Sequence, residues 1–227
     1  MTITDRIIGL DSSYIKHKES EWSGGAISEL FSAFNDGGIE CEVGEFLYGL
    51  TRLLKPERVL ETGSHHGVGT AYIGLALKDN GKGVLDTIEF LQPNFEITDK
   101  RIDRLGLRDH VLNRLQDVKD FVPIQGVFPT ITPIYDLVLL DTEPQTRFGE
   151  LLQFFKFVKE GGFIFIHDLH RHMHQIENAE HFFAWPYGRL PNEIVKMVKD
   201  DVIRPFHFTT PRGLTGFYKV HSSDYKF

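Results

Sequence analysis

The most informative part of the chain reads Val59-Leu60-Glu61-Thr62-Gly63-Ser64-His65-His66-Gly67-Val68-Gly69-Thr70. A short apolar run is followed by an acidic residue and then by three spaced glycines, a pattern typical of a buried strand that turns through a loop into a helix. Glycines let a backbone turn sharply and let a ligand approach it closely. An ordinary glycine-rich turn reads the same way, so the rest of the chain has to decide between a ligand cradle and a simple turn.

The spacing of these glycines argues against a nicotinamide dinucleotide site. Such sites use Gly-x-Gly-x-x-Gly. Counted from Gly63, that pattern needs glycines at positions where this chain has His65 and Val68. The observed spacing is Gly63-x-x-x-Gly67-x-Gly69. A nicotinamide-dependent oxidoreductase is therefore disfavoured.

Composition places the chain among ordinary globular proteins. Its 227 residues suffice for one large α/β domain, and 41% of them are hydrophobic and 25% charged. The formal net charge is −7, without a cluster of lysines or arginines. Nucleic-acid binding needs a basic surface, so DNA and RNA are excluded as expected partners. The sequence leaves the oligomeric state open, a homo-oligomer included.

The sequence also predicts a compartment. Cys41 is the single cysteine, so no intramolecular disulfide can form, which favours a reducing cytoplasm. The first residues lack the layout of a secretory signal. No apolar run approaches the roughly 18 residues that a membrane-spanning helix needs, so no membrane association is expected.

The N-terminal part reads differently from the rest. Residues 1–25 are polar and irregular, and residues 26–35 look helical. We interpret residues 1–41 as an arm with a helix that could fold over a site as a flap, and residues 42–227 as the main domain. That domain opens with an apolar stripe at helical spacing between Val43 and Leu54, ended by Pro56.

Strand and helix patterns then alternate along the chain. Strands are expected at residues 59–62, 83–90, 110–115, 135–140 and 163–166, and helices at 69–78, 94–105 and 147–159, with a short helix after Asp117. Apolar runs alternating with helices predict a parallel sheet covered on both faces. Residues 205–210 and 214–220 flank Pro211-Arg212-Gly213 and predict a C-terminal hairpin.

In this order the motifs resemble class I S-adenosylmethionine-dependent methyltransferases, from about Glu42 to Val220. The resemblance implies a Rossmann-like, doubly wound, mostly parallel seven-stranded sheet with a C-terminal antiparallel hairpin and N-terminal helices. It also implies S-adenosylmethionine as the cofactor. The glycine loop would cradle the cofactor's amino-acid part.

The resemblance assigns roles to polar residues after the predicted strands, where open α/β sheets bind ligands. Glu61 would order the glycine loop, and Glu89 would accept the ribose hydroxyls. Asp117 would approach the adenine, although it could equally cap the next helix. The predicted cofactor-binding residues are Glu61, Gly63, Ser64, Gly67, Gly69, Glu89, Asp117 and Asp141.

Asp141 and the pair His167-Asp168 end neighbouring predicted strands and could converge on one ion. They resemble the metal sites of catechol-type and macrolide-sugar O-methyltransferases, where the pair is usually two acids or an acid and an amide. With an imidazole, the site would accept Mg²⁺ or, more readily, Mn²⁺, Fe²⁺ or Zn²⁺. A metal could orient and acidify a substrate hydroxyl. Alternatively, Asp141 and Asp168 only organise loops around a metal-free base.

A histidine-rich segment follows, at residues 167–174, and His170 is a candidate base beside Asp141 and His167. The aromatic segment 181–187 could wall a pocket or pack beneath a loop. The predicted function is O-methylation of a hydroxyl on a small molecule, natural-product-like or sugar-like, assisted by a divalent metal. The alternatives are a metal-independent N- or O-methyltransferase with a histidine base, and a non-catalytic cofactor-binding subunit.

Overall fold

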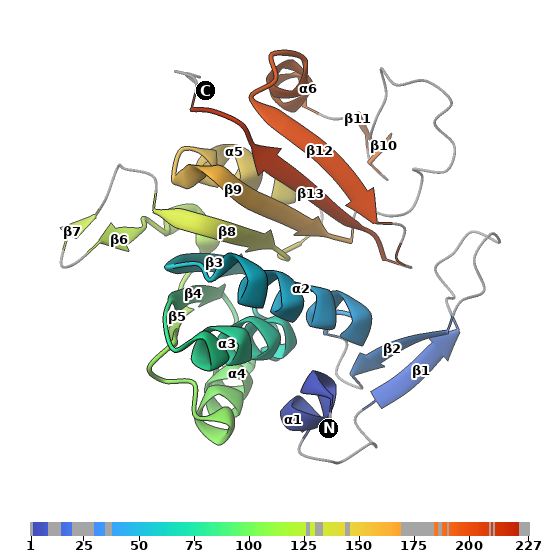
Figure 1. Ribbon diagram of the computed structural model, residues 1–227, viewed down its shortest axis with the longest axis vertical. Helices are drawn as coiled ribbons and strands as arrows, with labels where there is room; N and C mark the ends of the chain where they lie inside the picture. Colours follow the sequence, from blue (N-terminus) through green and yellow to red (C-terminus); the bar gives the residue numbers. More distant parts are fainter. Residues whose placement is uncertain are drawn as a thin grey trace.

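The structure, a computed structural model, describes residues 2–8, 15–19, 30–34, 38–125, 128–129, 134–143, 146–168, 184–185, 188–189, 191–208, 210 and 212–222. Its centre is a seven-stranded sheet with the strand order β12-β13-β9-β8-β3-β4-β5 (Figure 1). The strands of this sheet are β3 (Arg58–Thr62), β4 (Val84–Glu89), β5 (Val111–Leu115), β8 (Tyr135–Leu140), β9 (Val158–His167), β12 (Ile203–Phe208) and β13 (Leu214–Lys219).

Strand β13 is antiparallel to both of its neighbours, and the other pairs of the sheet are parallel. The predicted fold, a mostly parallel sheet closed by a C-terminal hairpin, is therefore confirmed. The helices are α1 (Ile3–Ile8), α2 (Cys41–Leu54), α3 (Val68–Asn80), α4 (Gln92–Leu105), α5 (Arg147–Phe155) and α6 (Asn192–Lys199), with a 3-10 helix at Val118–Asp120. None of the described helices is long and apolar enough to cross a membrane.

Two apolar cores flank the sheet. One core joins α1, α2, α3 and α4 to one face, through residues such as Leu47, Tyr72 and Ile102. The other joins α5 and α6 to the opposite face, through residues such as Phe154 and Met197. Figure 1 shows the first group of helices together along one side of the sheet. Because both faces are covered, the central strands are mostly buried and rich in apolar residues, as the sequence pattern indicated.

The N-terminal prediction was wrong in two respects. Residues 1–25, expected to be irregular, contain helix α1 and strand β1 (Ile15–Glu19). Residues 30–34, expected to be helical, form strand β2 (Leu30–Phe34), which pairs antiparallel with β1. A short apolar segment cannot be assigned to helix or strand by periodicity alone, and here a pairing partner earlier in the chain determines the outcome. Helix α1 is anchored as well, because Ile7 is fully buried in the core.

Two further differences between the predicted and the observed elements lie in the second half of the chain. The helix expected to end before Gly161-Gly162 ends at Phe155, and β9 begins at Val158, because its first residue pairs with Tyr135 of β8. Helix α6 was not predicted. Short two-stranded sheets also occur, formed by β6 (Ile124–Gln125) with β7 (Phe128–Pro129) and by β10 (Ala184–Trp185) with β11 (Gly188–Arg189).

Gly63 ends β3 in a conformation that other residues adopt only with strain, at φ = 76°. A Cβ atom there would lie 2.5 Å from the carbonyl oxygen of Asp141, in the backbone after β8. We expect Gly63→Ala to lower the free energy of unfolding by more than about 2 kcal/mol, since backbone strain and a backbone clash add. Urea denaturation would measure this change.

The matched control is Gly81→Ala. Gly81 has a similar φ of 68°, but a Cβ atom there would meet nothing within 4 Å. Gly81→Ala should lower the free energy of unfolding by about 1 kcal/mol, which is the cost of the backbone conformation alone. Equal losses for the two variants would contradict the proposed contact between Gly63 and the backbone of Asp141.

Candidate functional site

A cavity of about 960 Å³ opens at the carboxyl ends of the parallel strands. It lies where β3 is flanked by β4 on one side and β8 on the other, the position at which open α/β sheets bind their ligands. Most of the residues predicted to bind the cofactor line it. These are Glu61, Gly63, Ser64, Gly69, Glu89, Asp117 and Asp141.

The glycine loop is shaped by contacts within the protein. Gly67 caps α3 at φ = 74°, and a Cβ atom there would lie 2.9 Å from the side chain of Thr98 on α4. A Cβ atom on Gly69 would overlap the carboxylate of Glu61 beneath the loop. Gly67 does not line the cavity, so its requirement for glycine comes from α4 and from its backbone conformation.

Glu61 is the buried support of this loop. Its Oε2 atom accepts hydrogen bonds from the hydroxyls of Thr70, at 2.5 Å, and Thr87, at 2.6 Å. Burial raises the pKa of Glu61 to about 7, although the two hydroxyls oppose that rise. The carboxylate therefore joins β3, β4 and α3 below the glycines, which agrees with the ordering role expected for it.

Glu89, at the end of β4, holds the rim of the cavity. Its two carboxylate oxygens accept hydrogen bonds from the amides of His65 and Leu91, each at 2.8 Å. Each carboxylate oxygen has a second lone pair that can accept another bond. Asp117 accepts from the amide of Lys119 at 2.9 Å and so caps the short 3-10 helix, and it lines the cavity as well. Both roles weighed for Asp117 are thus compatible.

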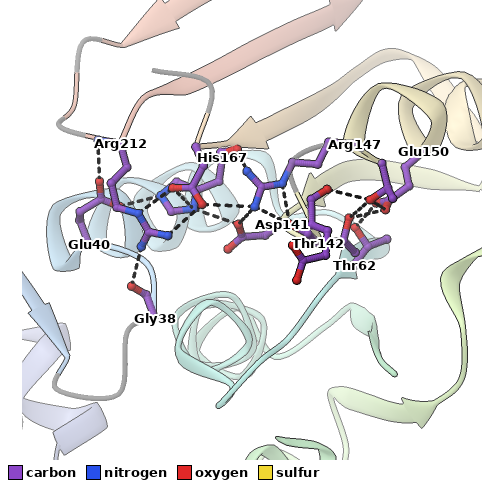
Figure 2. A network of polar contacts seen from close by, with 12 residues as sticks. Gly38, Glu40, Thr62, Asp141, Thr142, Arg147, Glu150, His167 and Arg212 are labelled. Atoms are coloured by element: carbon purple, nitrogen blue, oxygen red, sulfur yellow. Dashed lines mark hydrogen bonds and ion pairs between the residues drawn. The ribbon is translucent and has the colours of Figure 1, made fainter. Parts of the chain in front are cut away.

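The other end of the cavity contains a network of charged residues that we call the ion cluster. It consists of Glu40, Asp141, Arg147, His167, Asp168 and Arg212 (Figure 2). The carboxylates come from the ends of β8 and β9 and from the segment before α2. Charges of opposite sign alternate through it, which compensates for their removal from water.

Arg147, the first residue of α5, lies in the middle of the ion cluster and is only 3% exposed. Its Nη2 atom is 3.2 Å from Asp141 Oδ1 and 3.2 Å from Asp168 Oδ2. It also donates to the backbone carbonyls of Thr142, after β8, and His167, at the end of β9. One guanidinium therefore ties together the loops that follow two neighbouring strands.

His167 is fully buried between carboxylates. Its Nε2 is 2.6 Å from Glu40 Oε2, and its Nδ1 is 3.0 Å from Asp141 Oδ1. Burial alone would lower the pKa of His167, but the charges of Asp168, Asp141 and Glu40 outweigh it and raise the pKa to about 10. The imidazole is thus cationic at neutral pH. His167 is not among the residues that line the cavity.

Arg212 closes the ion cluster from the turn between β12 and β13. Its Nε and Nη2 atoms lie 2.6 and 2.8 Å from the two carboxylate oxygens of Asp168. Its Nη1 donates to the carbonyl of Gly38, and its backbone amide donates to Glu40. The segment before α2 is thereby held against the hairpin, and both segments border the cavity.

The predicted metal ligands do come together. Asp141, His167 and Asp168 offer ligand atoms that all lie within 4.8 Å of one another. Those atoms, however, already face cations of the chain: Arg147 lies between the two carboxylates, and Arg212 pairs with both oxygens of Asp168. A divalent ion would have to displace permanently charged guanidiniums. The residues as arranged therefore do not fit a resident divalent metal.

Some of the residues predicted for the site lie outside the part of the chain that the structure describes. His170 and most of the histidine-rich and aromatic segments lie outside the described residues, so His170 stays a prediction. Sequence reasoning missed Glu40, Arg147 and Arg212. Glu40 is 127 positions from His167 along the chain and Arg212 is 44 from Asp168, so no local pattern could connect them.

The strand order and the cavity at the carboxyl ends of the strands define a Rossmann-like fold of the type found in class I methyltransferases. Residues 60–169 match a protein family described as a methyltransferase domain. A catechol O-methyltransferase from Niastella koreensis is 32% identical over 107 residues. That match covers 46% of this chain and 47% of the relative, so it spans about half the length of each protein.

Solved structures share the fold at low sequence identity. Methyltransferase PaMTH1 from Podospora anserina, solved with SAH, has a TM-score of 0.64 at 15% identity, with 96% of this chain and 95% of that chain covered. O-methyltransferase TomG from Streptomyces achromogenes, involved in tomaymycin synthesis and solved with SAM, has a TM-score of 0.62 at 16% identity, covering 83% and 84%. The predicted fold is confirmed: this chain shares the fold of these solved methyltransferases, and residues 60–169 match a methyltransferase domain.

The raised pKa of His167 makes stability depend on pH. Its ordinary value is 6.5 and its folded value about 10, so the folded state binds the proton more tightly. This stabilisation is fully present below pH 6.5 and is lost as the pH rises towards about 10. We expect the free energy of unfolding of the wild type to fall across that window. In His167→Gln the fall should be much smaller.

Urea denaturation across this pH range would measure the effect. The control is His221→Gln, at an exposed position outside the ion cluster, which should keep the wild-type pH dependence. A His167→Gln variant with the full wild-type dependence would mean that other groups cause it.

Proposed function

We propose that this protein is an S-adenosylmethionine-dependent O-methyltransferase that methylates a hydroxyl group of a small molecule. The observation that carries the proposal is one continuous cavity with two chemically different ends. The glycine loop, Glu89 and Asp117 border one end, and Asp141 and the arginines of the ion cluster border the other. The match to a protein named catechol O-methyltransferase supports hydroxyl oxygen as the acceptor atom.

The first end suits the polar parts of the cofactor. Glu89 keeps lone pairs for ribose hydroxyls while it holds the loop amides in place. The backbone of Gly63 and Ser64 borders the same space and would receive the amino-acid part. Phe90, Leu91 and Val118 add an apolar wall beside Asp117, which suits a flat heterocycle such as adenine. S-adenosylmethionine has each of these chemical features.

Asp141 is the residue best placed to contact the acceptor. Its Oδ1 atom takes the contacts with Arg147 and His167, and among the described residues its Oδ2 has no hydrogen-bond partner. The side chain is 16% exposed and lines the cavity. We infer that Oδ2 accepts the hydrogen bond of the substrate hydroxyl and fixes the direction of its oxygen.

The reaction would then be an in-line displacement. The acceptor oxygen forms a bond to the methyl carbon while the bond between that carbon and the sulfonium sulfur breaks. The products are the methyl ether and neutral S-adenosylhomocysteine, and the hydroxyl proton passes to Asp141. No step of this reaction involves a metal ion, because the residues that would hold one are paired with arginines of the chain.

The cofactor end can be tested with Glu89→Gln. This variant keeps the side chain's size but removes its charge and one acceptor. S-adenosylhomocysteine should bind about 10- to 100-fold more weakly, since a hydrogen bond to a charged group contributes about 1.5–3 kcal/mol. Isothermal titration calorimetry would measure it. Glu96→Gln, on the exposed surface of α4, is the matched control, and NAD should give no heat with any variant. An unchanged affinity in Glu89→Gln would remove this residue from the site.

The acceptor end can be tested with Asp141→Asn. The amide keeps the shape of the carboxylate but accepts a proton poorly, so methyl transfer should fall by at least about 100-fold. Binding of S-adenosylhomocysteine should change much less. Assays with a panel of phenolic and sugar hydroxyls, followed by mass spectrometry of the products, would measure transfer. Asp103→Asn, at an exposed site on α4, is the control. Methylation of amines alone would identify an N-methyltransferase. Binding of S-adenosylhomocysteine without methyl transfer to any acceptor would identify a non-catalytic cofactor-binding subunit.

A further inference from the structure

We propose that Arg147 and Arg212 hold the position in which a divalent metal would bridge Asp141 and Asp168, so that the acceptor end of the cavity operates without a resident metal. The proposal rests on the proposed function only in calling this the acceptor end. It makes the two arginines positioning residues, which act on the substrate through the carboxylates that they orient.

Arg147 cannot easily leave this position. Besides its contacts with Asp141 and Asp168, it donates from Nε to the carbonyl of Thr142 at 2.8 Å and from Nη1 to the carbonyl of His167. Swinging it away would leave these buried carbonyls without their donor and a buried charge without its partners. An ion approaching the two carboxylates therefore meets a fixed positive charge.

Arg212 blocks the remaining approach to Asp168. It pairs with both carboxylate oxygens, and it is 32% exposed, so it is the more easily removed of the two arginines. At Oδ1 the contact is an ion pair without hydrogen-bond geometry, because Oδ1 has no hydrogen-bond partner among the described residues. Removing Arg212 would thus leave Asp168 Oδ1 facing, among the described residues, the imidazole Nδ1 of His167 at 3.5 Å, with lone pairs that a metal could use.

Charge balance points the same way. Two carboxylates and two guanidiniums carry no net charge between them. A dication added to these four groups would leave two positive charges in a mostly buried place, where electrostatic interactions are stronger than in water. Replacing Arg212 by a neutral residue lowers that excess of positive charge and makes the carboxylate of Asp168 accessible to an ion. The arginines therefore serve in place of the metal's charge.

The experiment is a titration with Mn²⁺ followed by electron paramagnetic resonance, on protein saturated with S-adenosylhomocysteine. The wild type should show no saturable Mn²⁺ binding at millimolar ion concentrations. Arg212→Met should bind one Mn²⁺ at least about tenfold more tightly than the wild type, because one repelling charge is gone and Asp168 Oδ1 is released, while Oδ2 keeps its contact with Arg147. Adding Asp168→Asn to that variant should abolish the gain.

Arg204→Met is the matched control. Arg204 lies in the same hairpin but pairs with Asp201 at an exposed site, so its removal should leave Mn²⁺ binding as in the wild type. Saturable binding of one Mn²⁺ by the wild type, lost in Asp168→Asn, would overturn the proposal. Failure of Arg212→Met to gain affinity while it stays folded by circular dichroism would overturn it too.

The titrations of the wild type and of Asp168→Asn do not depend on Arg212→Met, so they remain decisive even if Arg212→Met does not fold. Calorimetry with S-adenosylhomocysteine on the same samples separates this proposal from the proposed function. If the wild type does not bind S-adenosylhomocysteine in the calorimeter, the methyltransferase function is contradicted. If the wild type binds both S-adenosylhomocysteine and Mn²⁺, only the replacement of the metal by arginine is contradicted.

Discussion

The end of the sheet that carries the site depends on one buried cation. Arg147 binds the carbonyl that follows β8 and the carbonyl that ends β9, and it separates two carboxylates that would otherwise repel each other. A parallel sheet presents all of its carboxyl ends at one edge, so polar groups concentrate there. The guanidinium, with five donors in a rigid plane, can satisfy carbonyls and carboxylates at the same time.

The same network connects distant parts of the chain. Glu40, before α2, reaches His167 at the end of β9, and Arg212 reaches Asp168, Glu40 and Gly38 from the hairpin turn. Glu150 of α5 extends the network, because its carboxylate accepts hydrogen bonds from the hydroxyls of Thr62, at 2.6 Å, and Thr142 (Figure 2). The cavity wall is therefore assembled from distant parts of the chain, and charge pairing helps to hold these parts together.

The glycine motif owes its spacing to the protein as well as to a ligand. Gly63 lets β3 approach the backbone after β8, Gly67 clears Thr98, and Gly69 clears the carboxylate of Glu61. Such constraints act whether or not a cofactor is bound. A motif of this kind thus reports the geometry of the strand-to-helix turn, and the polar groups around it indicate which ligand the turn receives.

The sequence by itself determined the order of the main sheet's strands along the chain, the helices α2, α3, α4 and α5, the position of the glycine loop, and the acids at the strand ends. These follow from local periodicity, turn residues and spacing, which a single chain displays directly. It did not determine β2, α6 or the start of β9, since pairing and packing partners decide short ambiguous segments. Only the tertiary structure decided that His167 is a buried cation and that arginines face Asp141 and Asp168. Those properties depend on residues such as Glu40 and Arg212, which folding brings together from far apart in the sequence.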